Sequence, residues 1–243
     1  MSTEQIVLVV GASRGIGLSL VEQLAARPDT TAIGTARGSC AALEAITPKV
    51  KVLTLDLLDE ESIQKAASTI PELDTLIVNG AIGARDPVTI IPTDKLFEYL
   101  NINVLGPHRV IQAFLPALRA RKTRRIIGIS SVGGSLATHA APGSLAAQGL
   151  AGCYSTSKAA FNMMLVQFHN ELQKERFTVI VLHPGFVATD MGNQAHLLKL
   201  AEKAGLVGMP VSTSVEGILK VVDGLDHTKS ASFFDWKGDI VPW

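Results

Sequence analysis

Residues 6–17 read Ile-Val-Leu-Val-Val-Gly-Ala-Ser-Arg-Gly-Ile-Gly, an apolar run that passes directly into a turn rich in glycine. The run is typical of a buried strand, and the spacing of apolar residues after it predicts a helix. Such a turn suits a pyrophosphate, because bare backbone lets the anion approach and the helix N-terminus attracts it. The alternative is a tight turn in which glycine only supplies a positive φ. We favour a nucleotide site, for which the expected contacts are Gly11, Ser13, Arg14, Gly15, Ile16 and Gly17.

Short β-branched runs alternate with amphipathic stretches along the chain. The runs are continuously apolar, as in strands that are covered on both faces, so the order strand–helix–strand predicts a parallel sheet. With right-handed crossovers this is a doubly wound, Rossmann-type α/β fold with helices on both faces. The length of 243 residues fits one such domain over residues 1–243. The expected strands are 6–10, 31–35, 51–55, 75–78, 125–129, 178–182 and a seventh near 232–234, and the expected helices are 16–26, 60–67, 94–118 and 155–173.

The composition narrows the classes of partner and compartment. Lys and Arg together number 22, as do Asp and Glu, so the net charge of zero excludes a strongly basic nucleic-acid binder and favours a small-molecule partner. Cys40 and Cys153 form no disulfide framework and the histidines lack zinc spacing, so we expect a reducing compartment and no metal. The sequence shows neither a secretory signal nor an apolar run of membrane-spanning length, which predicts a cytoplasmic protein.

The segment from residue 119 to residue 125 has five basic residues in seven. A nucleic-acid patch would carry interleaved aromatic residues, and this segment has none. Because the helix dipole favours cations at a helix C-terminus, we interpret the segment as a solvated helix end.

Two arginines bear on the choice of dinucleotide. An acidic residue about 20 positions after the glycine turn would bind the ribose 2′-hydroxyl of NAD(H). Here Arg37 stands at that distance from Gly17, and Arg14 lies inside the turn. Two guanidinium groups are able to clamp a 2′-phosphate, and no carboxylate competes there. The sequence therefore predicts NADP(H), and the alternative is that both side chains are ordinary solvated arginines.

Polar and small residues follow the third and fourth expected strands. The third ends in Asp56 and Leu57, and the carboxylate could accept from an adenine amino group or cap the helix that begins near residue 59. The fourth ends in Asn79 and Gly80, where small residues permit close approach of a cofactor and the amide could tie neighbouring loops together. Both alternatives for Asp56 stay open, and a plain turn is the alternative at the end of the fourth strand.

Tyr154 and Lys158 lie four residues apart in a stretch that is expected to be helical, so they share one face. A lysine cation about 4 Å from the phenol, at an effective dielectric near 20, contributes on the order of 4 kcal/mol to its ionisation. This corresponds to roughly 3 pKa units and would bring the Tyr154 pKa from about 10 toward about 7, where general acid–base catalysis is efficient. The alternative is a packed tyrosine and a solvated lysine.

Three further segments could complete a site around this pair. Ser131 follows the fifth expected strand, where its hydroxyl could bind a substrate carbonyl oxygen. Asn103 is an ordinary polar residue of a helix unless that helix is locally broken, in which case it could anchor a water beside Lys158. The sixth strand is followed by a proline-containing turn, which cannot continue a strand and would cover one face of a bound nicotinamide. The expected contacts in that turn are Pro184, Val187 and Thr189.

In their order along almost the whole chain, these features resemble the short-chain dehydrogenase/reductase family. The matching residues are 11–17, Asp56, Asn79, Asn103, Ser131, Tyr154, Lys158 and 184–189. The resemblance implies a Rossmann-type fold with a seven-stranded parallel sheet. It also implies Tyr154 as proton donor or acceptor, Lys158 as binder of the nicotinamide ribose and tuner of Tyr154, Ser131 as orienter of the carbonyl, Asn103 as water anchor for a proton relay, and Thr189 as contact of the carboxamide.

The chain departs from the family pattern at two places. Ala81 stands where the family's Asn-Asn-Ala-Gly motif has its glycine, and a long segment rich in alanine and glycine, 133–152, separates Ser131 from Tyr154. That spacing, together with residues 234–243, resembles the C-factor and sniffer-type carbonyl reductase branch. The branch includes fungal ketoreductases similar to norsolorinic acid reductase.

These interpretations together predict an NADPH-dependent carbonyl reductase, or an alcohol dehydrogenase in the reverse direction. Apolar residues in 133–152 and 191–211 would line the pocket, and the glycines of the second segment suit a lid, so we expect a fairly apolar carbonyl or alcohol substrate. One alternative is a non-catalytic NADP(H)-binding regulator on the same fold, and another is an epimerase or dehydratase that uses the same tyrosine. The long helices after the fourth and fifth strands predict a homodimer or homotetramer.

Overall fold

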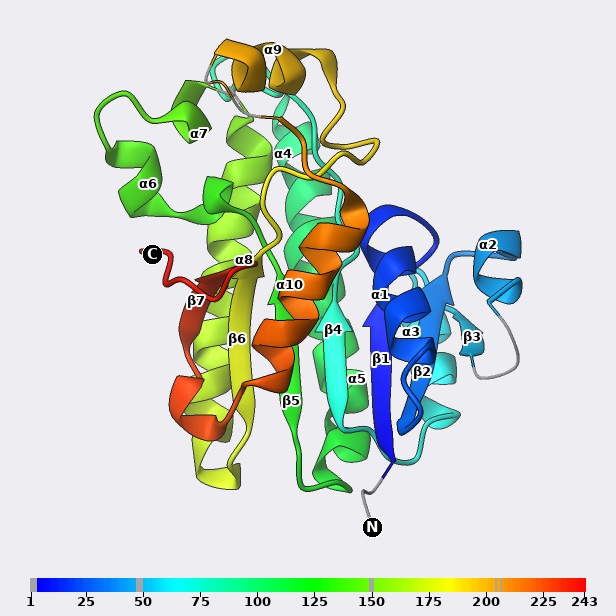
Figure 1. Ribbon diagram of the computed structural model, residues 1–243. Helices are drawn as coiled ribbons and strands as arrows, with labels where there is room; N and C mark the ends of the chain where they lie inside the picture. The colour runs from blue at the N-terminus through cyan, green and yellow to red at the C-terminus, as the bar shows by residue number, and fades with distance from the viewer. Residues whose placement is uncertain (1–3, 47–49, 149–150, 204, 206) are drawn as a thin grey trace.

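The computed structural model describes residues 4–46, 50–148, 151–203, 205 and 207–243. Its centre is a seven-stranded parallel sheet with the order β3-β2-β1-β4-β5-β6-β7 (Figure 1). The predicted doubly wound, Rossmann-type α/β fold is confirmed, and the expected strands are present with small shifts at their ends. The strands are β1 (Gln5–Val10), β2 (Thr30–Ala36), β3 (Val50–Thr54), β4 (Thr75–Val78), β5 (Arg125–Ile129), β6 (Thr178–His183) and β7 (Ser232–Asp235).

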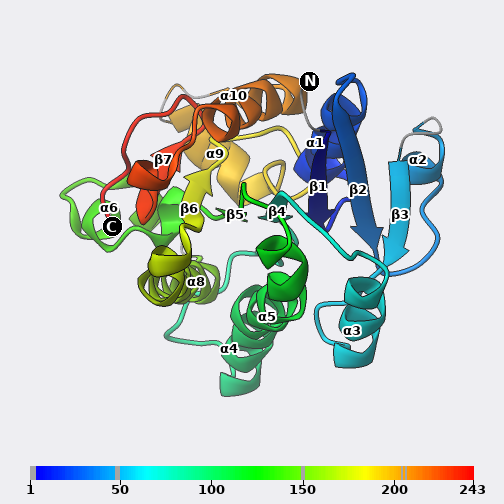
Figure 2. The same ribbon diagram turned by 90° about the horizontal axis from the view of Figure 1, so that it is seen from below.

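Helices cover both faces of this sheet. Figure 2 shows α1 and α10 on one face and α3, α4, α5 and α8 on the other. In the described part of the chain, no helix combines the length and apolar character needed to cross a membrane. The helices are α1 (Gly15–Ala25), α2 (Ala41–Glu44), α3 (Glu60–Ser68), α4 (Thr93–Leu100), α5 (Gly106–Arg119), α6 (Leu136–Ala140), α7 (Leu145–Gln148), α8 (Gly152–Leu172), α9 (Ala195–Lys203) and α10 (Val211–Asp223).

Strand β1 shows why the strands read as continuous apolar runs. Leu8 and Val10 belong to the core that the sheet forms with α5 and α8, whereas Val7 and Val9 belong to the core formed with α1 and α10. Alternate residues of a strand face opposite sides, so a strand covered by helices on both sides must be apolar at every position.

The order of the strands places a crevice beside β1. This strand pairs with β2 on one side and with β4 on the other, so the chain winds outward to β3 and then returns to continue in the opposite direction. At such a switch point the loops after the two strands diverge, and ligands bind in the crevice between them. The glycine turn after β1 and Asn79 after β4 flank this crevice.

The expected continuous helix over residues 94–118 is wrong. A π-helical turn, Asn101–Leu105, separates α4 from α5. The next residue, Gly106, packs so closely on the loop after β3 that a Cβ there would lie 2.7 Å from Leu57 Cβ. Single π-helical turns are frequent at functional sites, and this one contains Asn103. The local break that the hypothesis for Asn103 required is therefore present.

Candidate active site

Two glycines of the turn between β1 and α1 occupy positions that exclude a side chain. Gly11 has a φ of +80°, and a Cβ there would lie 2.5 Å from Gly80 Cα. A Cβ at Gly17 would lie 2.2 Å from the carbonyl oxygen of Gly11. Asn79 donates a hydrogen bond from Nδ2 to that same oxygen at 2.8 Å. The loops after β1 and β4 are thus tied together by Asn79, as the sequence predicted, and the plain-turn alternative for this residue is wrong.

The start of α1 is open to an anion. Gly15 begins the helix with a φ of +55°, and in the described structure no side chain caps this end and no acidic residue lies in its first turn. The first N–H groups of a helix lack partners within the helix, and its dipole attracts negative charge. Ser13 is exposed beside this end, and Ile16 packs against the α1–α10 side of the core. The bare turn and the uncapped helix fit the pyrophosphate of a dinucleotide.

The two arginines that were assigned to a 2′-phosphate are both exposed. Arg37 directly follows β2 at its carboxyl end. Arg14 forms an ion pair with Asp190, with 3.1 Å between Nη1 and Oδ2. The prediction that no carboxylate competes there is therefore wrong, because a residue from the segment after β6 reaches the glycine turn. Exposed pairs of this kind contribute little to stability, so Arg14 can exchange its partner at low cost.

The loop after β3 settles one open alternative. Asp59 caps α3, since its Oδ1 accepts hydrogen bonds from the N–H groups of Glu61 at 3.0 Å and Ser62 at 3.2 Å. Asp56 does not cap the helix, and its Oδ1 accepts from the N–H of Leu58 at 3.0 Å. The contact of Asp56 with adenine stays a prediction. Leu57 lies beside Gly80, where a Cβ would be 3.3 Å from its Cδ1.

Tyr154 and Lys158 lie together near the start of α8. The Lys158 Nζ is 5.8 Å from the centre of the Tyr154 ring and donates to the carbonyl oxygen of Ile129, at the end of β5, at 2.9 Å. Lys158 is only 3% exposed. Burial lowers the pKa of Lys158 to about 7, because the charged amine has lost its water and has gained a carbonyl rather than an anion.

The predicted lowering of the Tyr154 pKa toward 7 is wrong for this structure. Burial raises the pKa of Tyr154 to about 12, and a hydrogen bond with Ser131 opposes the rise only in part. The spacing of four residues does bring the phenol and the amine together, but burial removes water from both groups and disfavours the phenolate and the ammonium alike.

Ser131 reaches Tyr154 from the end of β5. It caps a short 3-10 turn, Val132–Gly134, and its Oγ accepts from the N–H of Gly133 at 3.0 Å. Its hydroxyl and the Tyr154 ring lie side by side against Gly133, and the hydroxyl opposes part of the rise in the Tyr154 pKa. Residues from β5 and α8 thereby meet at one point, as predicted.

Asn162 is a residue of this region that the sequence analysis missed. It accepts from Ser130 Oγ at 2.5 Å and donates to the carbonyl oxygen of Gly134 at 3.2 Å. All three groups are buried, so these bonds fix the turn that carries Ser131 against α8. Asn162 lies four residues after Lys158, and that helical spacing was the signal that could have found it.

The side chain of Asn103 is 1% exposed, and both N–H groups of its amide donate hydrogen bonds. Its Nδ2 donates to the carbonyl oxygen of Ile82 and to Ser157 Oγ, each at 2.9 Å, and its Oδ1 accepts from the N–H of Ile82 at 2.9 Å. It therefore clamps the loop after β4 to the residue that precedes Lys158. The role of Asn103 as a water anchor stays a prediction.

The segment after β6 folds back over the glycine turn. A Cβ at Gly15 would lie 3.4 Å from Thr189 Cγ2, so Thr189 stands beside the start of α1. Thr189 Oγ1 accepts from the N–H of Gly192 at 3.1 Å, and Val187 pairs with Met209 in an isolated bridge. The backbone carbonyl of Pro184 accepts from Ser214 at 2.6 Å, which anchors the segment to α10.

The loop after β4 meets the beginning of the expected lid, 191–211, next to Tyr154. A Cβ at Gly83 would lie 3.0 Å from Met191 Sδ and 3.1 Å from Tyr154 Cδ2. Gln194 Nε2 donates to the carbonyl oxygen of Gly83 at 2.9 Å. Neither Gly83 nor Gln194 was among the predicted site residues, because their meeting depends on two loops that are far apart in the sequence.

Comparison with known proteins assigns the family. The sequence model of the family described as short chain dehydrogenase matches residues 5–197, and the chain belongs to that family. An uncharacterised oxidoreductase of Schizosaccharomyces pombe is 34% identical over 100% of this chain and 99% of its own length. C-signal of Myxococcus xanthus is 41% identical over 70% of this chain and 93% of its own length.

Among solved structures, an NADPH-bound carbonyl reductase from chicken fatty liver superposes with a TM-score of 0.87 at 29% identity, with 100% of both chains covered. These similarities confirm both the family and the carbonyl reductase branch that the sequence indicated. The chain is an oxidoreductase of this family.

Proposed function

We propose that the chain is an NADPH-dependent carbonyl reductase, which reduces a ketone or aldehyde to an alcohol. The observation that carries the proposal is the meeting of Tyr154, Lys158 and Ser131 at the carboxyl edge of the sheet, the edge that also carries the glycine turn. Doubly wound folds bind their ligands at this edge of the sheet. The NADPH-bound carbonyl reductase with the same fold supports the choice of cofactor and reaction.

The residues around the crevice fit each part of the cofactor. The glycine turn and the uncapped start of α1 would hold the pyrophosphate, and Arg37 with Arg14 would hold the 2′-phosphate. Bound NADPH supplies the hydride for the substrate carbonyl carbon. The remaining contacts would come from Asp56, Leu57, Asn79, Gly80, Lys158, Pro184, Val187 and Thr189.

Tyr154 is suited to donate a proton. With a pKa of about 12 its phenol stays protonated at neutral pH and can donate to the carbonyl oxygen as that oxygen gains negative charge. The reverse reaction needs a phenolate, which burial disfavours. Ser131 lies beside the phenol and would donate to the same substrate oxygen.

The surroundings of Tyr154 favour an apolar substrate. Met191 approaches the phenol from the expected lid, and Gly83 lines the other side without a side chain. The hydrogen bond from Gln194 to Gly83 would close the lid over the substrate and exclude water from the reacting carbonyl.

The test is NADPH oxidation over a panel of ketones, aldehydes and quinones with the parent chain and Tyr154→Phe. We expect Tyr154→Phe to lose about 100- to 10,000-fold in kcat while its affinity for NADPH is kept. Tyr99→Phe is the matched control, because the other tyrosine of the chain is bonded to Asp86 and lies outside the site. Full activity of Tyr154→Phe would overturn the proposal.

A non-catalytic NADP(H)-binding regulator is the second candidate. It is favoured by the similarity to a bacterial protein whose name, C-signal, describes a signal rather than an enzyme. Tight NADPH binding without turnover of any carbonyl in the panel would favour this candidate, and steady NADPH consumption would favour the reductase.

A further inference from the structure

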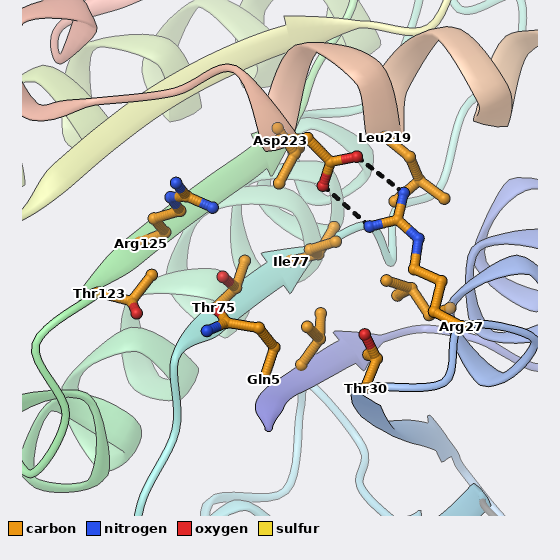
Figure 3. Close-up of a pocket in the computed structure, with 12 residues that line it drawn as sticks. Gln5, Arg27, Thr30, Thr75, Ile77, Thr123, Arg125, Leu219 and Asp223 are labelled. Carbon is orange, nitrogen blue, oxygen red and sulfur yellow. Dashed lines mark hydrogen bonds and ion pairs between the residues drawn. The ribbon is translucent and has the colours of Figure 1, made fainter. Parts of the chain in front are cut away.

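A pocket of about 270 Å³ opens at the amino-terminal edge of the sheet, opposite the carboxyl edge where Lys158 meets Ile129. It lies between the first residues of β1, β4 and β5 on one side and helices α1 and α10 on the other (Figure 3). The proposed reductase chemistry uses no residue of this pocket. Its lining is rich in polar side chains, which include Gln5, Thr30, Thr75, Thr123 and Arg125.

The sheet register forces Arg125 into this pocket. Arg125 is the first residue of β5 and pairs with Thr75 of β4. Ile127, two residues further along β5, packs in the core with α1 and α10, so Arg125 faces the same helices. An arginine in this position gives up part of its hydration, and burial accordingly lowers its pKa against the opposing effects of Asp223 and Asp74.

The guanidinium of Arg125 is poorly satisfied by the protein. Its Nη2 donates to the carbonyl oxygen of Leu225 at 2.8 Å. Within the described residues this is its single side-chain hydrogen bond, and it has no carboxylate within ion-pair distance. A guanidinium carries five N–H donors in a planar fork, so most of the donors of Arg125 are available to a ligand.

The two carboxylates near Arg125 are Asp223, which lines the pocket, and Asp74, and both are already engaged. Asp223 forms a two-pronged ion pair with Arg27, at 2.8 and 2.9 Å, and Figure 3 shows Arg27 and Arg125 on opposite sides of the pocket. Asp74 accepts from Arg121, from Thr123 and from the N–H of Ile6. The pocket therefore keeps an excess of positive charge next to hydroxyl and amide groups.

The other basic residues of the segment 119–125 differ from Arg125. Arg119 pairs with Glu175, Arg121 pairs with Asp74 and Glu72, and Arg124 donates to three backbone carbonyls. The interpretation of this segment as a solvated helix end fits Arg119, which is exposed in the last turn of α5. It is wrong for Arg121 and Arg124, which are partly buried and tied to protein acceptors. Arg125 is the basic residue of this segment that lines the pocket.

We propose that this pocket binds a small oxyanion of the phosphate class. The Arg125 guanidinium, the Thr75 hydroxyl and the Gln5 amide line one side of the pocket in Figure 3. Thr75 is 2% exposed and lines the pocket next to Arg125, its partner in the register of β4 with β5. A tetrahedral anion offers oxygens to the guanidinium fork and to these other donors together, whereas a planar carboxylate would satisfy fewer of them.

The test is a titration with inorganic phosphate at constant ionic strength, set with sodium chloride, in the presence of saturating NADPH. NADPH keeps phosphate from the glycine turn. We expect saturable binding by calorimetry and a rise in Tm of about 3–6 °C at ten times the Kd. Acetate at the same concentration should bind more weakly than phosphate.

Variants locate the site. Arg125→Met should weaken phosphate binding at least about tenfold, and Thr75→Val about two- to tenfold, whereas Lys122→Met should leave it unchanged. Lys122 is an exposed cation of the same segment and serves as the matched control. Asp223→Asn should tighten binding, because it removes the nearest negative charge and frees Arg27.

Three results would overturn the proposal. These are phosphate binding by Arg125→Met and Thr75→Val equal to that of the parent, an equal rise in Tm with chloride alone, and acetate binding as tight as phosphate. Since Asp223→Asn is expected to gain affinity, its result stands even where Arg125→Met folds poorly. NADPH oxidation is not the readout, so failure here leaves the proposed reductase untouched.

Discussion

A basic side chain lies at each end of strand β5, Lys158 of α8 at one end and Arg125 at the other. The two differ in whether they can lose their proton near neutral pH. Lys158 donates to the carbonyl oxygen of Ile129 at the carboxyl end, while Arg125 begins the strand and donates to that of Leu225. Each has a backbone carbonyl as its partner, and burial lowers the pKa of both. Lysine can lose its proton near neutral pH under these conditions, whereas arginine stays charged.

The two edges of the sheet therefore differ in the kind of charge that they carry. At the carboxyl edge the buried groups titrate, so their charge depends on pH and on what binds beside them. At the amino edge the charge is permanent and must be balanced by paired carboxylates or by a bound anion. A proton-transfer site needs the first kind of edge, and an anion site needs the second.

The largest effect is expected from removal of the carboxyl-edge cation. Lys158→Met should lower kcat/KM for NADPH-dependent reduction about 100- to 10,000-fold, because the amine that would bind the nicotinamide ribose and face the phenol is lost. Lys158→Arg keeps a charge but cannot shed it, and we expect it to restore little. Lys122→Met removes an exposed cation and should leave the rate unchanged. Parent-like activity of Lys158→Arg would show that a permanent charge suffices at this edge.

The second prediction concerns the pH dependence of stability without cofactor. The pKa of Lys158 falls from 10.5 to about 7 on folding, so between these values the unfolded chain binds more protons and stability rises with pH. The rise is roughly 5 kcal/mol at most. Lys158→Met should be more stable than the parent at pH 7, with a difference that shrinks toward pH 10, in urea unfolding.

Arg125→Met provides the contrast for that measurement. Because arginine does not titrate in this range, its replacement should shift stability by a constant amount from pH 7 to pH 10. If the unfolding free energies of the parent and Lys158→Met changed in parallel from pH 7 to pH 10, Lys158 would not be a buried amine that is protonated at the lower pH.

The sequence was sufficient for the sheet and for the closely packed glycines after β1. Continuous apolar runs such as 6–10 follow from burial on both faces, and the glycines at Gly11 and Gly17 follow from close backbone contacts that exclude a side chain. Both are local consequences of the fold class, so the pattern of residues reveals them.

The features that the sequence did not predict depend on contacts between segments far apart in the chain. The ion pair between Arg14 and Asp190 joins two loops, and nothing near either residue in the sequence indicates it. The pKa of Tyr154 depends on how much water the fold removes, which a spacing of four residues does not reveal. The burial of Arg125 follows from register with β4, which is known only after the strands are paired.

The third prediction compares an unpaired group with a paired one across the sheet. His183, at the carboxyl end of β6, has a buried Nδ1 without a partner among the described residues, whereas Asp74 at the amino edge has three. Burial lowers the pKa of His183 from 6.5 to about 4, with Asp235 opposing. Between these pH values His183 is protonated in the unfolded chain and neutral in the folded chain. The free energy of unfolding therefore decreases as the pH falls from 6.5 to 4.

We expect His183→Asn to reduce this acid-dependent loss by roughly 2 kcal/mol, measured as the difference in urea unfolding free energy between pH 6.5 and pH 4.5. The exposed His227, changed to Asn, is the control and should behave like the parent. An unchanged acid slope in His183→Asn would mean that carboxylates alone cause the loss.

The smallest effect is expected at the exposed rim of the carboxyl edge. Asp190 forms an ion pair with Arg14, the side chain that the proposed function assigns to the 2′-phosphate of NADPH. Asp190→Asn removes this competitor and should tighten NADPH binding by no more than about fivefold, because the pair is exposed and screened. The gain should be lost at high salt and should be absent for NADH, which carries no 2′-phosphate. Glu216→Gln removes an exposed carboxylate from α10 and controls for net charge, so an equal gain in that variant would assign the effect to long-range charge rather than to Arg14.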